Sequence, residues 1–268
     1  AAIAAKGSAR VKVIKYLMRQ WQALQQPRLT RRRLFFQGCL PTTLLCLLAL
    51  TACDFQYPRD PKKTLETVLE QQRIVVAVID HPPWVIVPDA GDPRGAEVEL
   101  VESFAAELGV EIDWRPLPSF TALRGLSRGD IDLVIGGLEQ PDVQLITGAG
   151  TTYSYFEERF VIGVRQGHPL PEALDGQAVF VPPEEPLSIL VRKQGGRPTD
   201  QMSAEVVLAA LPHWDLQAHG LQRSSIVLRR AKHVMAIPEG ENAWLMRLER
   251  LLRAQAADFD LRLREHRE

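Results

Sequence analysis

The sequence predicts an α/β protein whose sheets are mainly parallel and flanked by helices. From residue 64 onward, helical and extended hydrophobic patterns alternate along the chain, which is the order that β-α-β units produce. Two runs, residues 74–79 and 131–135, are largely apolar and β-branched, as expected for strands covered on both faces. Because the crossovers follow one another, the strands of one sheet should run parallel. The composition, 46% hydrophobic and 24% charged over 268 residues, is that of an ordinary globular protein.

The first half of this region contains three predicted helices and three predicted strands. Apolar residues with helical spacing define helices at residues 65–69, 100–108 and 120–126, and Gly109 and Gly129 stop the second and the third. The strands are predicted at residues 74–79, 111–115 and 131–135.

The second half continues the alternation with shorter elements. We predict strands at residues 160–164, 178–181 and 233–237, and short helices at residues 186–193 and 204–211. Asn242 can cap a last helix, which carries apolar residues on one side from Trp244 to Leu252. The continuation to residue 268 is highly charged, and we expect it to be a solvated helix end.

The N-terminal segment predicts export. Residues 1–52 hold nine of the 32 Lys and Arg residues and no Asp or Glu, with a cationic patch at 28–33 and a mainly apolar stretch at 34–50, which is the anatomy of a secretory signal. The ending Leu50-Thr51-Ala52-Cys53 resembles the lipobox of bacterial lipoproteins, in which the cysteine is acylated and the preceding peptide is removed. We therefore expect a signal segment over residues 1–52, with Met18 a candidate for the real start, a lipid on Cys53 and a tether over residues 53–63.

Two alternatives concern the membrane. A plain transmembrane helix over residues 34–52 would nearly reach the roughly 20 residues that a span requires. Asp54, directly after the cysteine, resembles an inner-membrane retention signal of enteric bacteria. This favours the periplasmic side of the inner membrane over the outer membrane.

Charge and cysteine positions exclude several classes of protein. From Cys53 onward the chain holds 23 basic and 33 acidic residues, a net charge of −10, which should repel nucleic acid. No cysteine follows Cys53, so the body contains neither a disulfide framework nor a cysteine-based metal site. His213 and His219 are six residues apart and share no helix face, and no phosphate or dinucleotide motif is present. We expect no metal and no cofactor.

Five stretches carry a family resemblance through their order and spacing. They are residues 74–79 followed by Pro82-Pro83-Trp84, residues 95–110, residues 126–138, Tyr153-Ser154-Tyr155-Phe156, and residues 233–240. Together they resemble the type II periplasmic solute-binding proteins of the amino-acid-uptake kind, the bacterial extracellular solute-binding protein family 3. The resemblance implies a two-lobed fold that closes over a small solute. Lobe one would comprise residues 64–159 plus 233–268, and lobe two residues 160–232.

The resemblance also directs attention to the loops at the ends of strands, because ligands of open α/β sheets bind beyond the carboxyl ends of the strands. Trp84 stands where the family places an aromatic that stacks on the solute, although it could instead cover the sheet edge. Gly136 and Gly137 have no Cβ, so their backbone amides could approach the solute closely, although a simple turn explains the two glycines as well. The ligand-binding residues predicted in this way are Asp80, His81, Trp84, Gly136, Gly137, Leu138, Glu139, Tyr155, Glu184 and Ser188.

Departures from the family bear on the ligand. The family's amino-acid binders have an arginine shortly after the glycine-rich strand end, where it holds the α-carboxylate, but this chain has no basic residue between Glu139 and Arg159. Glu184 and Glu185 occupy the predicted helix start that would receive the same carboxylate. We therefore expect a ligand other than a standard α-amino acid, such as a cation or a polar neutral molecule.

The expected function is that of a monomeric solute-binding lipoprotein that serves an ABC-type uptake system through a membrane permease. A ligand-sensing or partner-binding lipoprotein with a degenerate site is one alternative, and a small lyase of the same fold is another. Some membrane-bound relatives join this domain to a lytic transglycosylase. Because the sequence ends at Glu268 and offers no paired carboxylates for hydrolysis, we expect that the protein is not an enzyme.

Overall fold

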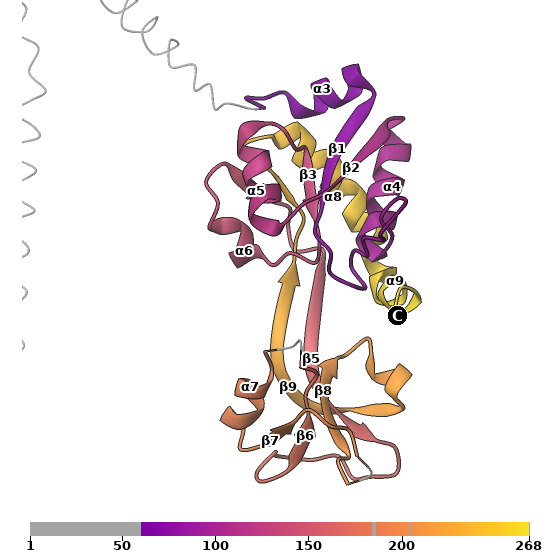
Figure 1. The fold of residues 1–268 in the computed structure, drawn as a ribbon, viewed down its shortest axis with the longest axis vertical. Helices are drawn as coiled ribbons and strands as arrows, with labels where there is room; N and C mark the ends of the chain where they lie inside the picture. Colours follow the sequence, from indigo (N-terminus) through magenta and orange to yellow (C-terminus); the bar gives the residue numbers. More distant parts are fainter. Residues whose placement is uncertain (1–59, 184–185, 204, 268) are drawn as a thin grey trace, which may run out of the picture. The chain divides into compact units, whose positions relative to one another are not determined.

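The computed structural model describes residues 60–183, 186–203 and 205–267, which form one compact unit (Figure 1). The predicted signal segment, the lipidation site Cys53, most of the tether and Glu184 lie outside the described residues. Within the described part, no helix is both long and apolar enough to cross a membrane.

The first lobe is built on a five-stranded mixed sheet. Its strands, in spatial order, are β2 (Glu111–Pro116), β1 (Arg73–Val78), β3 (Leu133–Ile135), β10 (Ala236–Pro238) and β4 (Ala149–Thr151). β1 pairs in parallel with both β2 and β3, whereas β10 runs antiparallel to β3 and β4. The chain therefore leaves this lobe after β4 and returns to it at β10.

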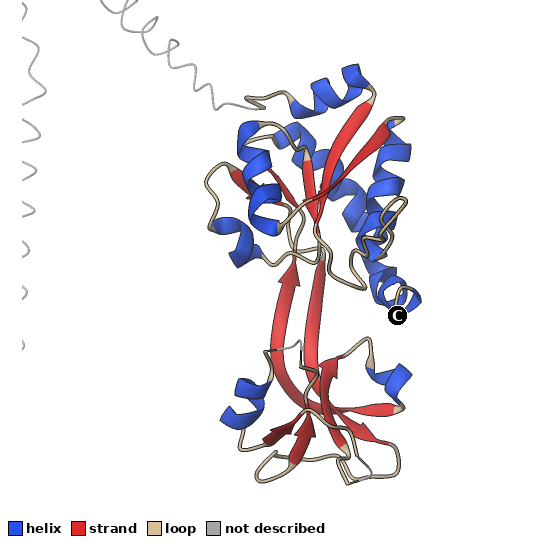
Figure 2. Cartoon of the chain, in the orientation of Figure 1, coloured by secondary structure: helices blue, strands red, loops and turns tan. Residues whose placement is uncertain are grey.

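Helices cover both faces of the first sheet (Figure 2). They are α3 (Thr64–Gln71), α4 (Ala96–Leu108), α5 (Ser119–Arg128), α6 (Gln140–Gln144), α8 (Asn242–Gln255) and α9 (Phe259–Glu265), with the 3₁₀ turn η2 (Ala256–Asp258) before α9. Val76 and Val78 of β1 pack in one core cluster with Phe104 of α4, and Ala77 packs in another with Leu126 of α5. Alternate residues of β1 are thus buried on opposite faces, as the β-branched run predicted.

The second lobe also has a mixed sheet, in the order β7 (Arg197–Thr199), β6 (Ala178–Phe180), β8 (Leu208–Pro212), β5 (Phe156–Arg165) and β9 (Leu221–His233). β6 is parallel to β7 and β8, and β5 is antiparallel to β8 and β9. Helix α7 (Ser188–Lys193) contributes Val191 to the core beside Ile162, and the 3₁₀ turn η1 (Leu216–His219) lies on the other core cluster. The predicted α/β fold with two lobes is confirmed, with mixed sheets.

β5 and β9 connect the two lobes (Figure 1). Their antiparallel register places Phe160 opposite Arg229, Glu158 opposite Ala231 and Phe156 opposite His233. Directly opposed residues share one face of a sheet, so these six side chains belong to one face and their sequence neighbours to the other. The predicted boundary between residues 159 and 160 falls within β5, and the lobe limits stay a prediction.

Two predictions about elements are wrong. The helix expected at residues 204–211 is instead strand β8, whose Leu208 to Leu211 are buried between β6 and β5. The C-terminal continuation is not solvated throughout, because Phe259 and Leu263 of α9 are fully buried in the core of the first lobe. In both places the local sequence pattern was ambiguous, and the structure of the segment is determined by its burial against a sheet or a neighbouring helix.

Candidate functional site

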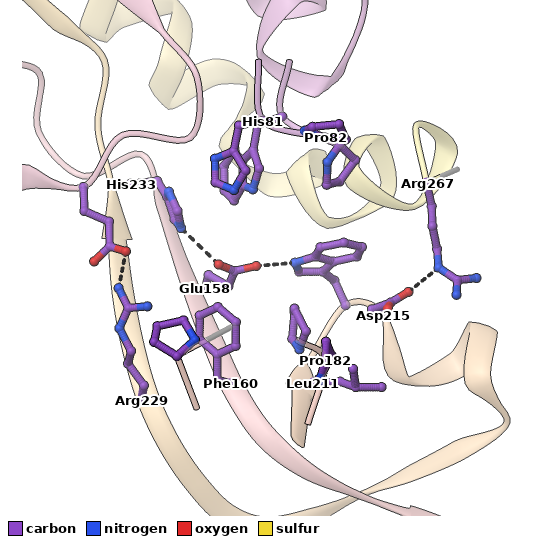
Figure 3. Close-up of a pocket in the computed structure, with 16 residues that line it drawn as sticks. His81, Pro82, Glu158, Phe160, Pro182, Leu211, Asp215, Arg229, His233 and Arg267 are labelled. Carbon is purple, nitrogen blue, oxygen red and sulfur yellow. Dashed lines mark hydrogen bonds and ion pairs between the residues drawn. The ribbon is translucent and has the colours of Figure 1, made fainter. Parts of the chain in front are cut away.

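A cleft of about 860 Å³ lies where the two lobes face each other (Figure 3). Its lining mixes proline and aromatic surfaces with charged side chains: His81, Pro82, Pro83, Trp84 and Glu139 from the first lobe, Glu158, Phe160, Arg229 and His233 from the connecting strands, Pro182, Pro186, Leu211, Pro212, Trp214 and Asp215 from the second lobe, and Arg267 near the C-terminus. Its volume is near the upper end of the range for small-molecule sites.

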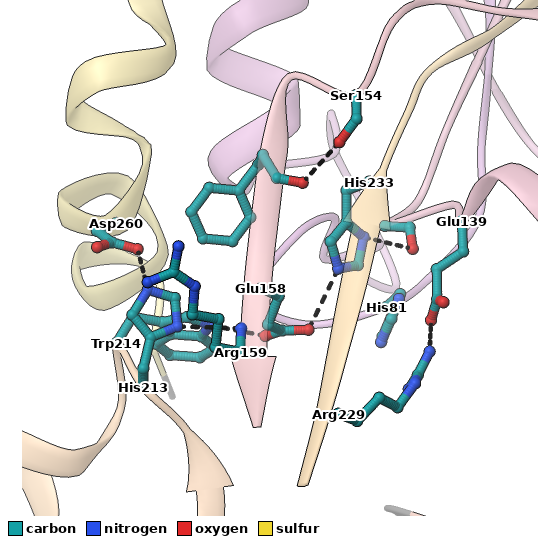
Figure 4. Close-up of polar contacts among 12 residues, drawn as sticks. His81, Glu139, Ser154, Glu158, Arg159, His213, Trp214, Arg229, His233 and Asp260 are labelled. Atoms are coloured by element: carbon teal, nitrogen blue, oxygen red, sulfur yellow. Dashed lines mark hydrogen bonds and ion pairs between the residues drawn. The ribbon is translucent and has the colours of Figure 1, made fainter. Parts of the chain in front are cut away.

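The cleft contains a buried Glu158–His233 pair, whose side chains are only 6% and 3% exposed (Figure 4). His233 Nε2 lies 3.2 Å from Glu158 Oε2, and His233 Nδ1 lies 3.0 Å from the carbonyl oxygen of Gly137. Both ring nitrogens therefore lie within hydrogen-bond distance of oxygen atoms. Trp214 Nε1 donates to Glu158 Oε1 over 2.7 Å. The pair thus links the connecting strands to the second lobe through Trp214 and to the first lobe through Gly137.

Trp84 covers the His233 ring. The two rings stack with centroids 3.9 Å apart and planes 27° apart, which is a favourable contact between two aromatic rings. Trp84 also contacts Phe156 and Phe259 and is only 2% exposed. Most of its surface is therefore used in packing within the protein.

A second ion pair, Glu139–Arg229, joins the first lobe to β9 (Figure 4). Glu139 directly precedes α6, and its backbone amide donates to Asp142. The Arg229 guanidinium carbon lies 5.4 Å from the centroid of the Phe160 ring, within the range of a cation–π contact. The side chains of Glu139 and Arg229 are 28% and 30% exposed, respectively, so this pair is open to the cleft.

The backbone amides of Gly136 and Gly137 donate to the carboxylate of Glu97, over 2.6 and 2.9 Å. Tyr155 donates its hydroxyl to the same carboxylate. Burial, followed by the negative charge of Glu97, raises the pKa of Tyr155 well above its ordinary value, so the phenol keeps its proton. Gly137 has a positive φ of 65°, and a Cβ there would lie 2.6 Å from His81 Nδ1. The position therefore requires glycine.

The structure brings three of the predicted ligand-binding residues, His81, Trp84 and Glu139, together in the cleft. Gly136, Gly137 and Leu138 lie behind them, with the two amides bound to Glu97 and the Leu138 side chain buried. The other predicted residues within the described part do not line the cleft: Asp80 accepts from the amide of Val87, Tyr155 lies in the core, and Ser188 borders a smaller cavity of about 390 Å³ in lobe two.

Sequence reasoning missed the charged residues of the connecting strands, Glu158, Arg229 and His233, and also Trp214. The signal that could have found them is the alternation of β5 and β9, in which every second residue faces the cleft. β9 itself was not predicted, because its polar residues hide the pattern.

The C-terminal helix forms a further contact with the second lobe near this cleft. His213 Nδ1 accepts from the Arg159 amide, and His213 Nε2 faces Asp260 of α9 at 3.3 Å (Figure 4). Arg267 pairs with Asp215 over 2.6 Å. A hydrogen bond from His213 lowers the pKa of Asp260 and outweighs the opposing effect of burial. Among the described residues no group of three or more His, Cys, Asp or Glu side chains could hold a metal ion.

Two α/β lobes joined by two strands, with a cleft between them lined by apolar and ion-paired side chains, define a two-lobed solute-binding protein. Residues 74–262 match the family model of the bacterial extracellular solute-binding proteins, family 3, and the chain belongs to this family. The predicted family is therefore confirmed.

Solved structures agree on the fold. An ancestral cationic amino acid solute-binding protein superposes with a TM-score of 0.60 at 14% identity, over 76% of this chain and all of that one. The L-cystine solute receptor of Neisseria gonorrhoeae, in its unliganded open conformation, gives 0.58 at 13% identity, over 74% of this chain and 92% of the receptor. At such identities the likeness establishes the fold alone.

The curated relatives carry a different kind of name. The membrane-bound lytic murein transglycosylase F of Vibrio cholerae serotype O1 is 32% identical over 120 residues, which are 44% of this chain and 22% of the relative. The protein of the same name from Actinobacillus succinogenes is 29% identical over 164 residues, 57% of this chain and 34% of the relative. The chain thus matches between about a fifth and a third of the length of these two relatives.

The prediction that the protein is not an enzyme is wrong, because these relatives are named for an enzyme activity. The prediction relied on the end of the sequence at Glu268 and on the lack of paired catalytic carboxylates in the binding fold. Neither observation excludes an enzyme activity, and the chain matches only part of the length of these relatives.

Proposed function

We propose that the chain recognises a murein-derived solute in the cleft between its two lobes and serves a murein-cleaving system of the cell envelope. The observation that carries this proposal is the cleft itself, a large site between two family 3 lobes that presents both flat apolar surfaces and ion pairs. The names of the matched relatives supply the class of solute.

The chemistry of the lining supports a fragment that contains both a ring and an acidic group. Five prolines provide flat surfaces against which a sugar ring or a peptide plane can pack, whereas Trp84 and Trp214, only 2% and 6% exposed, contribute little free surface. Arg229 and Glu139 provide donors and acceptors at the open side of the cleft. Murein fragments combine N-acetylated sugar rings with carboxylates, and they are larger than one amino acid.

The proposed ligand is not a standard α-amino acid. The amides at the end of β3 donate to Glu97 of the chain itself, and Glu139 follows them where the family resemblance implies a cationic receptor for the α-carboxylate. A free amino acid, which is small for a cleft of about 860 Å³, would have few further contacts with which to displace these internal carboxylates.

We also propose that the protein is held at the periplasmic side of a membrane, preferably the inner membrane, through a lipid on Cys53. The sequence motif and the membrane-bound names of the relatives support this anchor. Expression with a radiolabelled fatty acid should label the wild type, and Cys53→Ser should abolish the label and release the protein into the soluble fraction. Labelling of the Cys53→Ser variant would contradict the proposal.

An uptake receptor for an ABC-type permease is the second candidate, favoured by membership of family 3. The two candidates differ in their ligand. A murein-linked protein should respond to murein fragments, whereas an uptake receptor is expected to respond to a nutrient such as an amino acid, a polyamine or a sugar.

A thermal-shift screen of the purified chain separates the candidates. The panel contains N-acetylmuramic acid, muramyl peptides, N-acetylglucosamine, amino acids, polyamines and simple sugars. A ligand at 100 times its Kd should stabilise the folded state by about 2.7 kcal/mol. We expect a shift with muramyl compounds. A shift with amino acids or polyamines alone would favour uptake, and no shift with any muramyl compound would contradict the murein proposal.

A further inference from the structure

We propose that Arg229 receives an anionic group of the bound solute and that Glu139 is its internal counter-ion, which the solute displaces. The inference rests on the proposed function, because it assigns the acidic group of a murein-derived solute to one residue of the cleft. Before binding, Arg229 pairs with Glu139. After binding, it pairs with the solute carboxylate, and the Glu139 side chain turns to water.

The position of Arg229 suits this role. It lies on the face of β9 that turns toward the cleft, opposite Phe160 of β5, and its guanidinium lies over the Phe160 ring. Phe160 is itself only 3% exposed, so the ring is a fixed surface that orients the guanidinium plane. A planar guanidinium held in this way can bind a carboxylate through two parallel hydrogen bonds.

The position of Glu139 suits displacement. Its side chain is 28% exposed and comes from the loop before α6, whereas Arg229 comes from a connecting strand. A partly exposed ion pair contributes little net stability. A solute carboxylate that arrives with further contacts to the cleft can therefore replace Glu139 at small cost, because the Arg229 charge stays paired throughout.

The other ion pair of the cleft cannot exchange in the same way. Glu158 and His233 are almost fully buried, and Glu158 also accepts from Trp214. Removing either partner would leave a buried polar group without its hydrogen-bond partner, which is unfavourable. The geometry therefore points to Glu139–Arg229 as the exchangeable pair and to Glu158–His233 as a fixed one.

The exchange has two opposite consequences for affinity. Replacing Arg229 removes the receptor, so solutes with a carboxylate should bind more weakly. Replacing Glu139 removes the competitor, so the same solutes should bind more tightly. A solute in which a carboxamide replaces the carboxylate should be much less sensitive to both changes.

The chain supplies matched controls on the opposite face of the same strands. Arg230 follows Arg229 on β9 and pairs with Glu157 of β5 over 2.9 Å, outside the cleft lining. Arg230→Gln and Glu157→Gln change the net charge by the same amounts as Arg229→Gln and Glu139→Gln. They leave the proposed receptor in place.

The test measures dissociation constants by titration calorimetry for N-acetylmuramic acid and for its lactyl carboxamide, with the full chain. Wild type should bind the acid about tenfold or more tightly than the amide, as expected for a hydrogen bond between charged groups. Arg229→Gln should remove most of this preference and Glu139→Gln should increase it, whereas Arg230→Gln and Glu157→Gln should leave it unchanged. Arg229→Lys serves as a second variant, which keeps the charge and should retain only part of the preference.

Equal binding of acid and amide by wild type would overturn the role of Arg229 and leave the murein proposal standing. The same conclusion would follow if Arg229→Gln and Arg230→Gln had equal effects. Failure of the wild type to bind either compound would overturn the role of Arg229, and failure to bind the muramyl peptides as well would overturn the murein proposal. The comparison of acid and amide needs no substitution, so it decides the matter even if a variant fails to fold.

Discussion

Trp84 combines a position in the cleft with a structural role, and a substitution separates the two. Because the indole is 2% exposed and contacts His233, Phe156 and Phe259, Trp84→Ala should leave a cavity in the first lobe. We expect a loss of about 3–5 kcal/mol in the free energy of unfolding, the usual cost of removing a large buried aromatic. Urea unfolding of the unliganded protein measures it.

Phe120→Ala is the control for this prediction. Phe120 is 67% exposed on α5, so removing its ring should change the free energy of unfolding by less than about 0.5 kcal/mol. Equal effects of the two substitutions would show that Trp84 is not part of the core. A large effect of Trp84→Ala also means that loss of binding in this variant would not identify Trp84 as a ligand contact.

At the residue scale, sequence reasoning located the cleft and its Glu139, but not the charged residues of the connecting strands. The rule that ligands lie beyond strand ends led to His81, Trp84 and Glu139, because these residues follow β1 and β3 directly. It could not lead to Arg229 or His233, because they belong to a strand that runs between lobes. The sequence correctly showed that no arginine follows β3 closely. The cleft nevertheless contains a cationic side chain, Arg229, which comes from β9.

At the scale of elements, α9 shows why charged composition misled the prediction. The helix carries four charged residues, Asp260, Arg262, Arg264 and Glu265, beside a buried stripe formed by Phe259 and Leu263. Two apolar residues four positions apart are enough to attach a short helix to a core. The strands β1, β2 and β6 were predictable because their own sequences show the apolar runs or the alternation of apolar and polar residues that strands in a sheet have.

Phe259→Ala tests the contribution of α9. The ring is fully buried and contacts Trp84, Tyr155 and Phe156, so its removal should lower the free energy of unfolding by about 3–5 kcal/mol. Leu261→Ala, on the same helix but 53% exposed, should cost less than about 0.5 kcal/mol. If both variants unfold at the same denaturant concentration as wild type, α9 is dispensable for stability.

At the scale of the whole molecule, the contact between His213 and Asp260 connects the second lobe to the C-terminal helix. The Arg159 amide donates to His213 Nδ1, so the proton of a neutral His213 lies on Nε2 and points to Asp260. The hydrogen bond lowers the pKa of Asp260 in the folded protein below its ordinary value of 3.8. A lowered carboxyl pKa stabilises the folded state above the ordinary value, and this contribution is lost as the pH falls through the lowered pKa.

Asp260→Asn should remove this acid-dependent contribution. The difference in the free energy of unfolding between wild type and Asp260→Asn should be constant above the ordinary carboxyl pKa. It should shrink as the pH falls through the lowered pKa of Asp260. Urea unfolding at a series of acidic pH values measures the difference, with Asp258→Asn, an exposed carboxylate of the same segment, as the control. A difference that is independent of pH would mean that the contact does not hold Asp260 ionised.

The register of β5 and β9 limits how this chain can vary in length. Phe160 faces Arg229, and Phe156 faces His233, on one face of the sheet because the two members on each strand are four positions apart, an even number. A single inserted or deleted residue between positions 229 and 233 would turn either the Arg229 or the His233 side chain out of the cleft, because strand faces alternate with a period of two. Among homologues that keep this site, insertions and deletions should therefore collect in the turns of the second lobe and spare both connecting strands.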